Sequence, residues 1–241
     1  MHKSLLVLLL ALGAVACKDY NIKIDQDMRD EAQQMPVKGR QGNMLNQKVS
    51  YGEFRTDRVK RGWVKRYNIP FFIRFEGASE KLSFNQFNEQ GTTAEVFAIS
   101  KFTNKELPVL GEFFGIPIDY KFYFAGTIYL PATGHHYDFV VYNPEANTRF
   151  RRTHGFIKGP GLEADIQGIT QLDDRKVWNL DNLGFEYIQE NKSIGAVQVF
   201  NAGKVWIRKG LSEEHRLALA ALSTSLMIRS QDISNTLSIQ P

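Results

Sequence analysis

The sequence has one cluster of histidines, His135-His136, which lies close to Asp138 and is followed further along by His154. Adjacent residues of a β-strand point to opposite faces, so His136 and Asp138 share a face that excludes His135. With His154 on a neighbouring strand, they would supply three ligands for zinc and suit a metal-dependent or glycan-processing hydrolase. Gly134, just before the cluster, indicates instead a turn in which the histidines bind no metal.

Basic residues are concentrated in two stretches, residues 55–66 and 149–152. The second contains Arg149, Arg151 and Arg152, and on a strand Arg149 and Arg151 share one face. Such a face predicts a binding surface for an anionic partner: lipid headgroups, lipopolysaccharide phosphates or an acidic glycan. The competing interpretation is a solvated face whose charge is offset by acids elsewhere in the chain.

No group of residues has the spacing of a catalytic motif. The nucleophile elbow G-x-S-x-G is absent from the sequence. Gly159-Pro160-Gly161 indicates a tight turn, because it lacks the spacing and the following helix of a phosphate-binding loop. The sequence therefore predicts neither an enzyme nor a cofactor, and the expected role is binding or assembly.

Residues 1–16 have the organisation of a secretory signal peptide, with a short basic start, an apolar run and small residues at the end. The junction Ala14-Val15-Ala16-Cys17 resembles a bacterial lipobox, with alanine in place of the usual leucine. Cys17 is the only cysteine of the chain, so it cannot form an internal disulfide. The resemblance implies a lipoprotein acylated at Cys17, for example with palmitate. The alternative is an ordinary signal peptide with an incidental cysteine.

Lys18-Asp19, directly after the cysteine, resembles the lysine-plus-acid export tag of surface lipoproteins in Bacteroidota-type bacteria. That tag usually has two acids, and Tyr20 stands in the second place here. The resemblance implies anchoring in the outer membrane and leaves the periplasmic and cell-surface faces equally open. The membrane is therefore the partner expected at this end, through the N-terminal lipid, while protein partners are not indicated.

Composition and charge favour a packed domain over a nucleic-acid binder. The formal net charge is +4, whereas a dedicated nucleic-acid binder concentrates a strongly basic face. With 43% hydrophobic and 12% aromatic residues, the chain has enough apolar side chains for a core. Residues 17–47 are polar and predict a tether, with a helical turn near 27–34 or, alternatively, a short edge strand. Residues 48–241 are predicted to form a single β-rich domain.

Alternating apolar and polar residues predict a mainly β chain of about 12 antiparallel strands. The candidate strands span residues 49–55, 62–66, 71–76, 81–87, 92–102, 118–130, 137–143, 148–157, 164–171, 176–180, 184–190, 194–200 and 204–208. The last two are joined by Asn201-Ala202-Gly203, which predicts a hairpin with a left-handed glycine at the end of its loop.

A C-terminal helix is predicted over residues 212–229, with Ser212 as its N-cap. No side chain from Leu217 to Ile228 is charged, and a helix that is apolar on all sides is a buried one. This apolar part is about 18 Å long, which is too short to cross a bilayer core of about 30 Å. The strands are therefore expected to form a closed or strongly curved barrel around the helix, or alternatively a β-sandwich with the helix packed on it.

The segment from Gly184 to Ile228 contains a strand, a strand with small residues, a hairpin strand with Trp206, an acidic turn and an apolar helix. This order resembles the tubby-like fold, which includes the phospholipid scramblases and the plant LURP-one-related proteins. In these families a closed barrel surrounds a hydrophobic C-terminal helix. Members bind phosphoinositide headgroups or lie beside membranes, but this sequence has no motif onto which their binding residues can be placed.

Overall fold

The computed structural model describes residues 20–40, 47–62, 80–100, 123–142, 153–173 and 182–237. The strands predicted at 71–76 and 176–180 lie outside these ranges. The described strands are β1 Ala32–Pro36, β2 Ser50–Tyr51, β3 Phe54–Thr56, β4 Lys60–Arg61, β5 Glu80–Phe87, β6 Thr93–Ser100, β7 Tyr123–Leu130, β8 His135–Tyr142, β9 His154–Gly159, β10 Leu162–Ile169, β11 Gly184–Gln189, β12 Lys192–Gln198 and β13 Lys204–Arg208, and the helices are α2 Gln26–Glu31 and α4 Glu213–Leu237.

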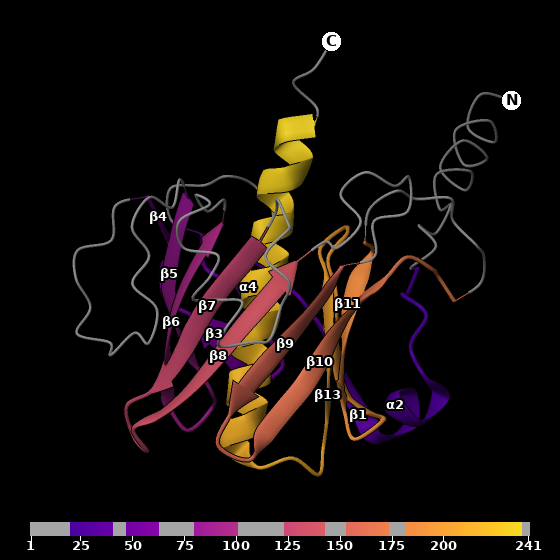
Figure 1. The fold of residues 1–241 in the computed structure, drawn as a ribbon, viewed down its shortest axis with the longest axis horizontal. Helices are drawn as coiled ribbons and strands as arrows, with labels where there is room; N and C mark the ends of the chain where they lie inside the picture. Colours follow the sequence, from indigo (N-terminus) through magenta and orange to yellow (C-terminus); the bar gives the residue numbers. More distant parts are fainter. Residues whose placement is uncertain are drawn as a thin grey trace, which may run out of the picture.

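The strands form one 13-stranded antiparallel sheet that curves nearly into a closed barrel (Figure 1). Its order is β1-β13-β12-β11-β10-β9-β8-β7-β6-β5-β3-β2, with β4 paired to β5. The two ends of this series meet at a single bridge, in which Lys38 and Ser50 exchange backbone hydrogen bonds of 2.8 and 3.0 Å. The prediction of a mainly β, barrel-like fold is confirmed. The alternative, a β-sandwich, would have two sheets, whereas the described strands form one curved sheet.

The alternation of residue types in the strands gives the barrel its two faces. In β10, Leu162, Ala164 and Ile166 are buried inside, while the intervening Glu163 and Asp165 are exposed outside. The predicted hairpin is also present: Val197 pairs with Val205, and Gly203 has φ +92°. A left-handed backbone at this position favours glycine, which explains why the loop ends on one.

Helix α4 fills the barrel. Every side chain from Leu217 to Ile228 is fully buried, as predicted for a helix with no charged face. Ser212 caps its start, since the Ser212 Oγ accepts the backbone N–H of His215 at 3.2 Å. The helix ends at Leu237 and not at 229, because the polar residues that follow contain no glycine or proline to stop it. Its last turns rise beyond the strands (Figure 1).

Two polar helix residues inside the barrel, Ser223 and Thr224, form hydrogen bonds with side chains of the strands. The Thr224 hydroxyl lies 2.8 Å from both the Tyr51 hydroxyl and the Gln86 Oε1. The Ser223 hydroxyl lies 2.9 Å from the Tyr187 hydroxyl and donates to the carbonyl of Leu219. A buried hydroxyl without a partner would destabilise the fold, so these bonds allow polar residues in the lumen. They also fix the rotation of α4 relative to β2, β5 and β11.

The N-terminal segment packs on the outside of the barrel. Ile22 and Met28 are fully buried and form a second, smaller apolar cluster with Leu172, Leu183 and Trp206. α2 leads directly into β1, which pairs with β13 along its whole length. Residues 20–40 pack on the domain and do not form the tether predicted for residues 17–47. The helical turn expected near 27–34 is present as α2, and the short edge strand of the alternative is present as β1.

Polar contacts reinforce this outer attachment. Arg29 forms an ion pair with Asp173, and Arg208 forms one with Glu31. The buried guanidinium of Arg40, whose pKa desolvation lowers to about 10, donates hydrogen bonds to the carbonyls of Val199, Asn201 and Met227. The segment is thus bound at both of its ends, to the sheet and to the helix inside it. Among the described residues, neither helix combines the length and apolarity needed to span a membrane.

Candidate functional site

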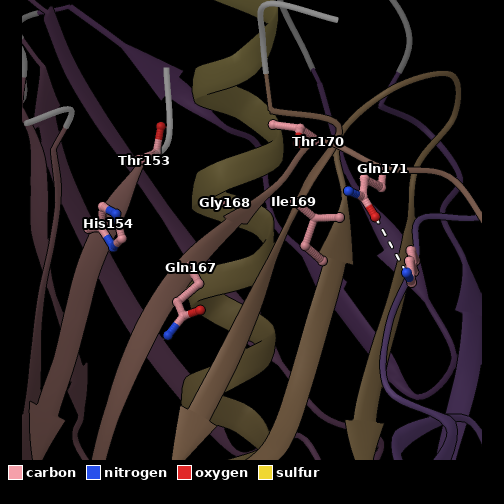
Figure 2. Close-up of a pocket in the computed structure, with 8 residues that line it drawn as sticks. Thr153, His154, Gln167, Gly168, Ile169, Thr170 and Gln171 are labelled. Carbon is pink, nitrogen blue, oxygen red and sulfur yellow. Dashed lines mark hydrogen bonds between the residues drawn. The ribbon is translucent and has the colours of Figure 1, made fainter. Parts of the chain in front are cut away.

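A shallow pocket of about 220 Å³ opens around the C-terminal end of β10 (Figure 2). Its lining residues are mostly neutral and able to form hydrogen bonds: Lys23, Thr153, His154, Gln167, Gly168, Ile169, Thr170 and Gln171. We call this pocket the β10 groove. It joins the β9–β10 hairpin to the N-terminal segment, which lies far from it in the sequence.

Sheet register places the exposed side chains of the groove in line. His154 pairs with Gln167 across β9 and β10, so both point outward from the barrel, as Figure 2 shows. Lys23 joins them because its backbone N–H donates to the carbonyl of Gln171 at 2.9 Å, and its ammonium donates to the Gln171 Oε1 at 3.4 Å. The groove therefore depends on the folded N-terminal segment.

Glycine is required at the floor of the groove. A Cβ at Gly168 would lie 2.0 Å from the Asn182 Oδ1 and 3.1 Å from the carbonyl oxygen of Thr153. The Asn182 Nδ2 donates to the Thr153 Oγ1 at 2.5 Å, and the Gly168 N–H donates to the Thr153 carbonyl. Because these bonds hold Asn182 against Gly168, a larger residue at 168 would disturb the floor.

The groove is equipped for binding more than for bond cleavage. Its lining side chains offer amide, hydroxyl, imidazole and ammonium groups, and none of the eight residues carries a carboxylate or a thiol. Thr153, the one buried hydroxyl, already accepts a hydrogen bond from Asn182. Nucleophilic catalysis requires a nucleophile within reach of a base, an arrangement that the lining residues lack.

The structure does not bring the proposed zinc ligands together. Asp138 and His136 lie on the outer face of β8, where His136 pairs with Tyr129. His154 lies opposite Tyr142, four residues beyond Asp138 along β8. At about 3.3 Å per residue this separation is about 13 Å, whereas zinc requires ligands at about 2 Å. Across the described residues, no three histidine, cysteine or acidic side chains are arranged to hold a metal ion.

His136 and Asp138 have local structural partners instead. The His136 ring stacks on Tyr129, with a centroid distance of 4.6 Å and an interplanar angle of 19°. Burial raises the pKa of the Asp138 carboxyl, and the hydrogen bond to Thr127 and the charge of His136 offset part of this rise. These contacts account for both residues as parts of the outer sheet face.

A second group of titratable residues gathers where α4 enters the barrel. The Glu214 Oε1 lies 2.6 Å from the Tyr137 hydroxyl and 2.6 Å from the His135 Nδ1. The His215 Nε2 lies 3.0 Å from the carbonyl oxygen of Pro160. A carboxylate at a helix N-terminus is favoured by the helix dipole, so Glu214 fastens the start of α4 to β8. This cluster has a structural role that sequence patterns did not indicate.

Replacing Glu214 is expected to change how stability depends on pH. Burial alone would raise the pKa of this carboxyl, but hydrogen bonds from Tyr137 and His135 and the charges of His135 and His215 lower it below its ordinary 4.5. A lowered pKa stabilises the fold above the unfolded-state pKa, and this stabilisation is lost as the pH falls through the folded-state value. Urea unfolding of Glu214→Gln should show lower stability at pH 7 and a smaller decrease in acid; an unchanged acid dependence would contradict this role.

No protein-family model, no curated protein and no solved structure matches this chain. A function must therefore be argued from the site itself, since a fold alone does not specify one. Of the residues singled out in the sequence, Cys17 and the arginines at 149, 151 and 152 lie outside the described ranges. The groove residues Lys23, Gln167 and Gln171 were missed, because neutral side chains carry no motif and Lys23 was assigned to the tether.

Proposed function

We propose that this protein is a lipid-anchored lipoprotein of the bacterial outer membrane with a non-enzymatic binding role. The observation that carries the proposal is the lipobox-like Ala14-Val15-Ala16-Cys17 junction with its single cysteine. The barrel around a buried C-terminal helix supports a tubby-like domain, as the resemblance implies. The β10 groove is the binding site that we assign to this domain. An anionic-ligand surface formed by Arg149, Arg151 and Arg152 is a separate proposal from the sequence, since these residues lie outside the described ranges.

The folded N-terminal segment supports a short connection between anchor and domain. Asn21 is fixed to the sheet, because its carbonyl accepts the N–H of Asp173 and its Oδ1 accepts the ammonium of Lys204. Asn21 is the fourth residue after Cys17, and four residue steps of chain span at most about 14 Å. An acylated Cys17 would therefore hold the domain directly at the membrane surface. Lys23 of the groove would then lie within about 20 Å of the lipid.

Replacing Cys17 with serine tests the anchor. Cells producing the wild-type protein should retain it in the membrane fraction and label it with radioactive palmitate, because the acyl chains partition into the bilayer. Cys17→Ser should be released into the soluble fraction and take up no label. A Gln167→Ala variant, changed far from the cysteine, serves as the control and should stay with the membrane. Retention of Cys17→Ser in the membrane would show that acylation is not what holds the protein.

A further inference from the structure

Aromatic side chains lie directly beside the β10 groove on the outer face of the sheet. Tyr142 pairs with His154, which pairs with Gln167, so these three side chains form one row across β8, β9 and β10. Phe156, two residues beyond His154, lies near Tyr142 with a ring-centroid distance of 6.4 Å. Both rings are partly exposed. Two neighbouring aromatic rings, inclined to each other by 36°, therefore border a row of exposed hydrogen-bonding groups.

The charges around the groove argue against a strongly anionic ligand. Lys23 is the one fully charged side chain of the lining, and its ammonium already donates to Gln171. Asp165 is exposed on the same face and pairs with Phe156, so a carboxylate lies next to the aromatic surface. Phosphate recognition in proteins typically relies on bidentate arginines or several charge-assisted donors. The described groove is better suited to a ligand rich in hydroxyl groups.

The size of the groove limits how much of a ligand it encloses. Pockets for small molecules usually have volumes of about 300–1,000 Å³ and bury most of the ligand. The β10 groove has about 220 Å³, so it accommodates one ring and leaves the rest of a longer ligand on the open sheet. A sugar ring combines an apolar face of C–H groups with a rim of hydroxyls, and this combination matches an aromatic surface bordered by amides and imidazole.

We propose that the β10 groove and the aromatic residues beside it bind an oligosaccharide of the cell envelope. One sugar ring lies against Phe156 and Tyr142, and its hydroxyl groups form hydrogen bonds with His154 and Gln167, which share a row with Tyr142. Gln171 and the ammonium of Lys23 lie further along the groove and would contact the next sugar of the chain. This inference rests on the proposed binding function and names its ligand class.

A glycan array of neutral and acidic bacterial oligosaccharides, probed with the full-length lipidated protein in detergent, tests this assignment. We expect retention of a group of glycans that share one terminal or internal sugar. Gln167→Ala and Phe156→Ala should each weaken the affinity roughly 3- to 10-fold, as expected for the loss of one hydrogen bond or one ring contact. Glu163→Ala is the matched control, because Glu163 is exposed on the same face of β10 but lies outside the groove. It should bind like the wild type.

The experiment separates this inference from the proposed function on which it rests. Thermal unfolding of all variants ensures that weaker binding reflects the groove and not the fold. Retention of no glycan, or binding that Gln167→Ala and Phe156→Ala leave unchanged, would overturn the saccharide assignment. Salt-sensitive binding to phosphatidylglycerol vesicles without glycan binding would also overturn it, while leaving a binding lipoprotein in place. If Cys17→Ser stays in the membrane and glycans still bind, the anchor fails and the groove assignment stands.

Discussion

Leu222→Asp is expected to prevent folding of the barrel. Leu222 is fully buried at the centre of the apolar part of α4, and neighbouring residues on all sides of the helix are buried too. An aspartate there would place a carboxylate in the lumen, where desolvation of an unpaired charge is costly. Domains are typically stable by only about 5–15 kcal/mol, so a defect of this kind removes most of that margin. Circular dichroism and thermal unfolding of the purified variant would measure the loss.

Two companion variants show whether the effect comes from burial. Leu222→Ala keeps the helix apolar and should fold, with a free energy of unfolding lowered by about 2–5 kcal/mol through the cavity that it leaves. Lys209→Asp introduces the same side chain at an exposed turn and should change stability by about 0.5 kcal/mol or less. A Leu222→Asp protein with the melting temperature of the wild type would mean that α4 lies on the surface.

The barrel and its helix were predictable because their signals are local. Alternation in segments such as Leu162–Ile169 indicates which side chains face the core, whatever the rest of the chain does. The uncharged stretch from Leu217 to Ile228 requires burial on every side, and only a curved sheet provides that in a mainly β chain. Fold class follows from these two patterns, whereas the pairing of β1 with β13 does not, since it joins residues far apart in sequence.

The packed N-terminal segment could not be predicted in the same way. Ile22 and Met28 are isolated apolar residues in a polar stretch, and such a pattern is typical of a linker. Their burial depends on Leu172, Leu183 and Trp206, which meet only when β10 to β13 are assembled. Trp206 packs in the outer cluster, where the N-terminal segment covers it. A segment that packs on a surface formed only by the assembled sheet does not need the periodic pattern of apolar residues that marks a core strand.

The groove escaped sequence reasoning for a related reason. Most of its residues are neutral, and sequence patterns for binding sites depend mostly on charged or metal-binding side chains. Register, not spacing, sets Gln167 beside His154, and chain reversal brings Lys23 to Gln171. Conversely, His136, Asp138 and His154 were predicted as zinc ligands from their residue types alone. In the fold, about 13 Å of strand separates His154 from Asp138, the nearer of the other two.

Ile22→Asp is expected to detach the N-terminal segment from the barrel. Ile22 is fully buried and forms a bridge with Leu172, and its backbone N–H donates a hydrogen bond to the Gln198 Oε1 at 3.2 Å. Its side chain also packs on Gly184, where a Cβ would lie 2.8 Å from the Ile22 Cδ1. A charge at this position should lower the free energy of unfolding by about 2–5 kcal/mol and expose Lys23 and Arg29 to trypsin. Urea unfolding and timed digestion measure both effects.

A control variant and digestion of the wild type distinguish a folded N-terminal segment from a tether. Gln33→Asp adds the same side chain at an exposed position of β1 and should leave stability and trypsin resistance unchanged. If residues 20–31 were a tether, trypsin would cleave the wild type after Lys23 and Arg29, and Ile22→Asp would have no effect. Detachment would also move the first fixed residue from Asn21 to Ala32, which extends the maximum reach from Cys17 to about 50 Å. The packed segment thus determines how closely a lipid on Cys17 would hold the groove to the membrane. Ile22→Asp would also remove Lys23 from the groove.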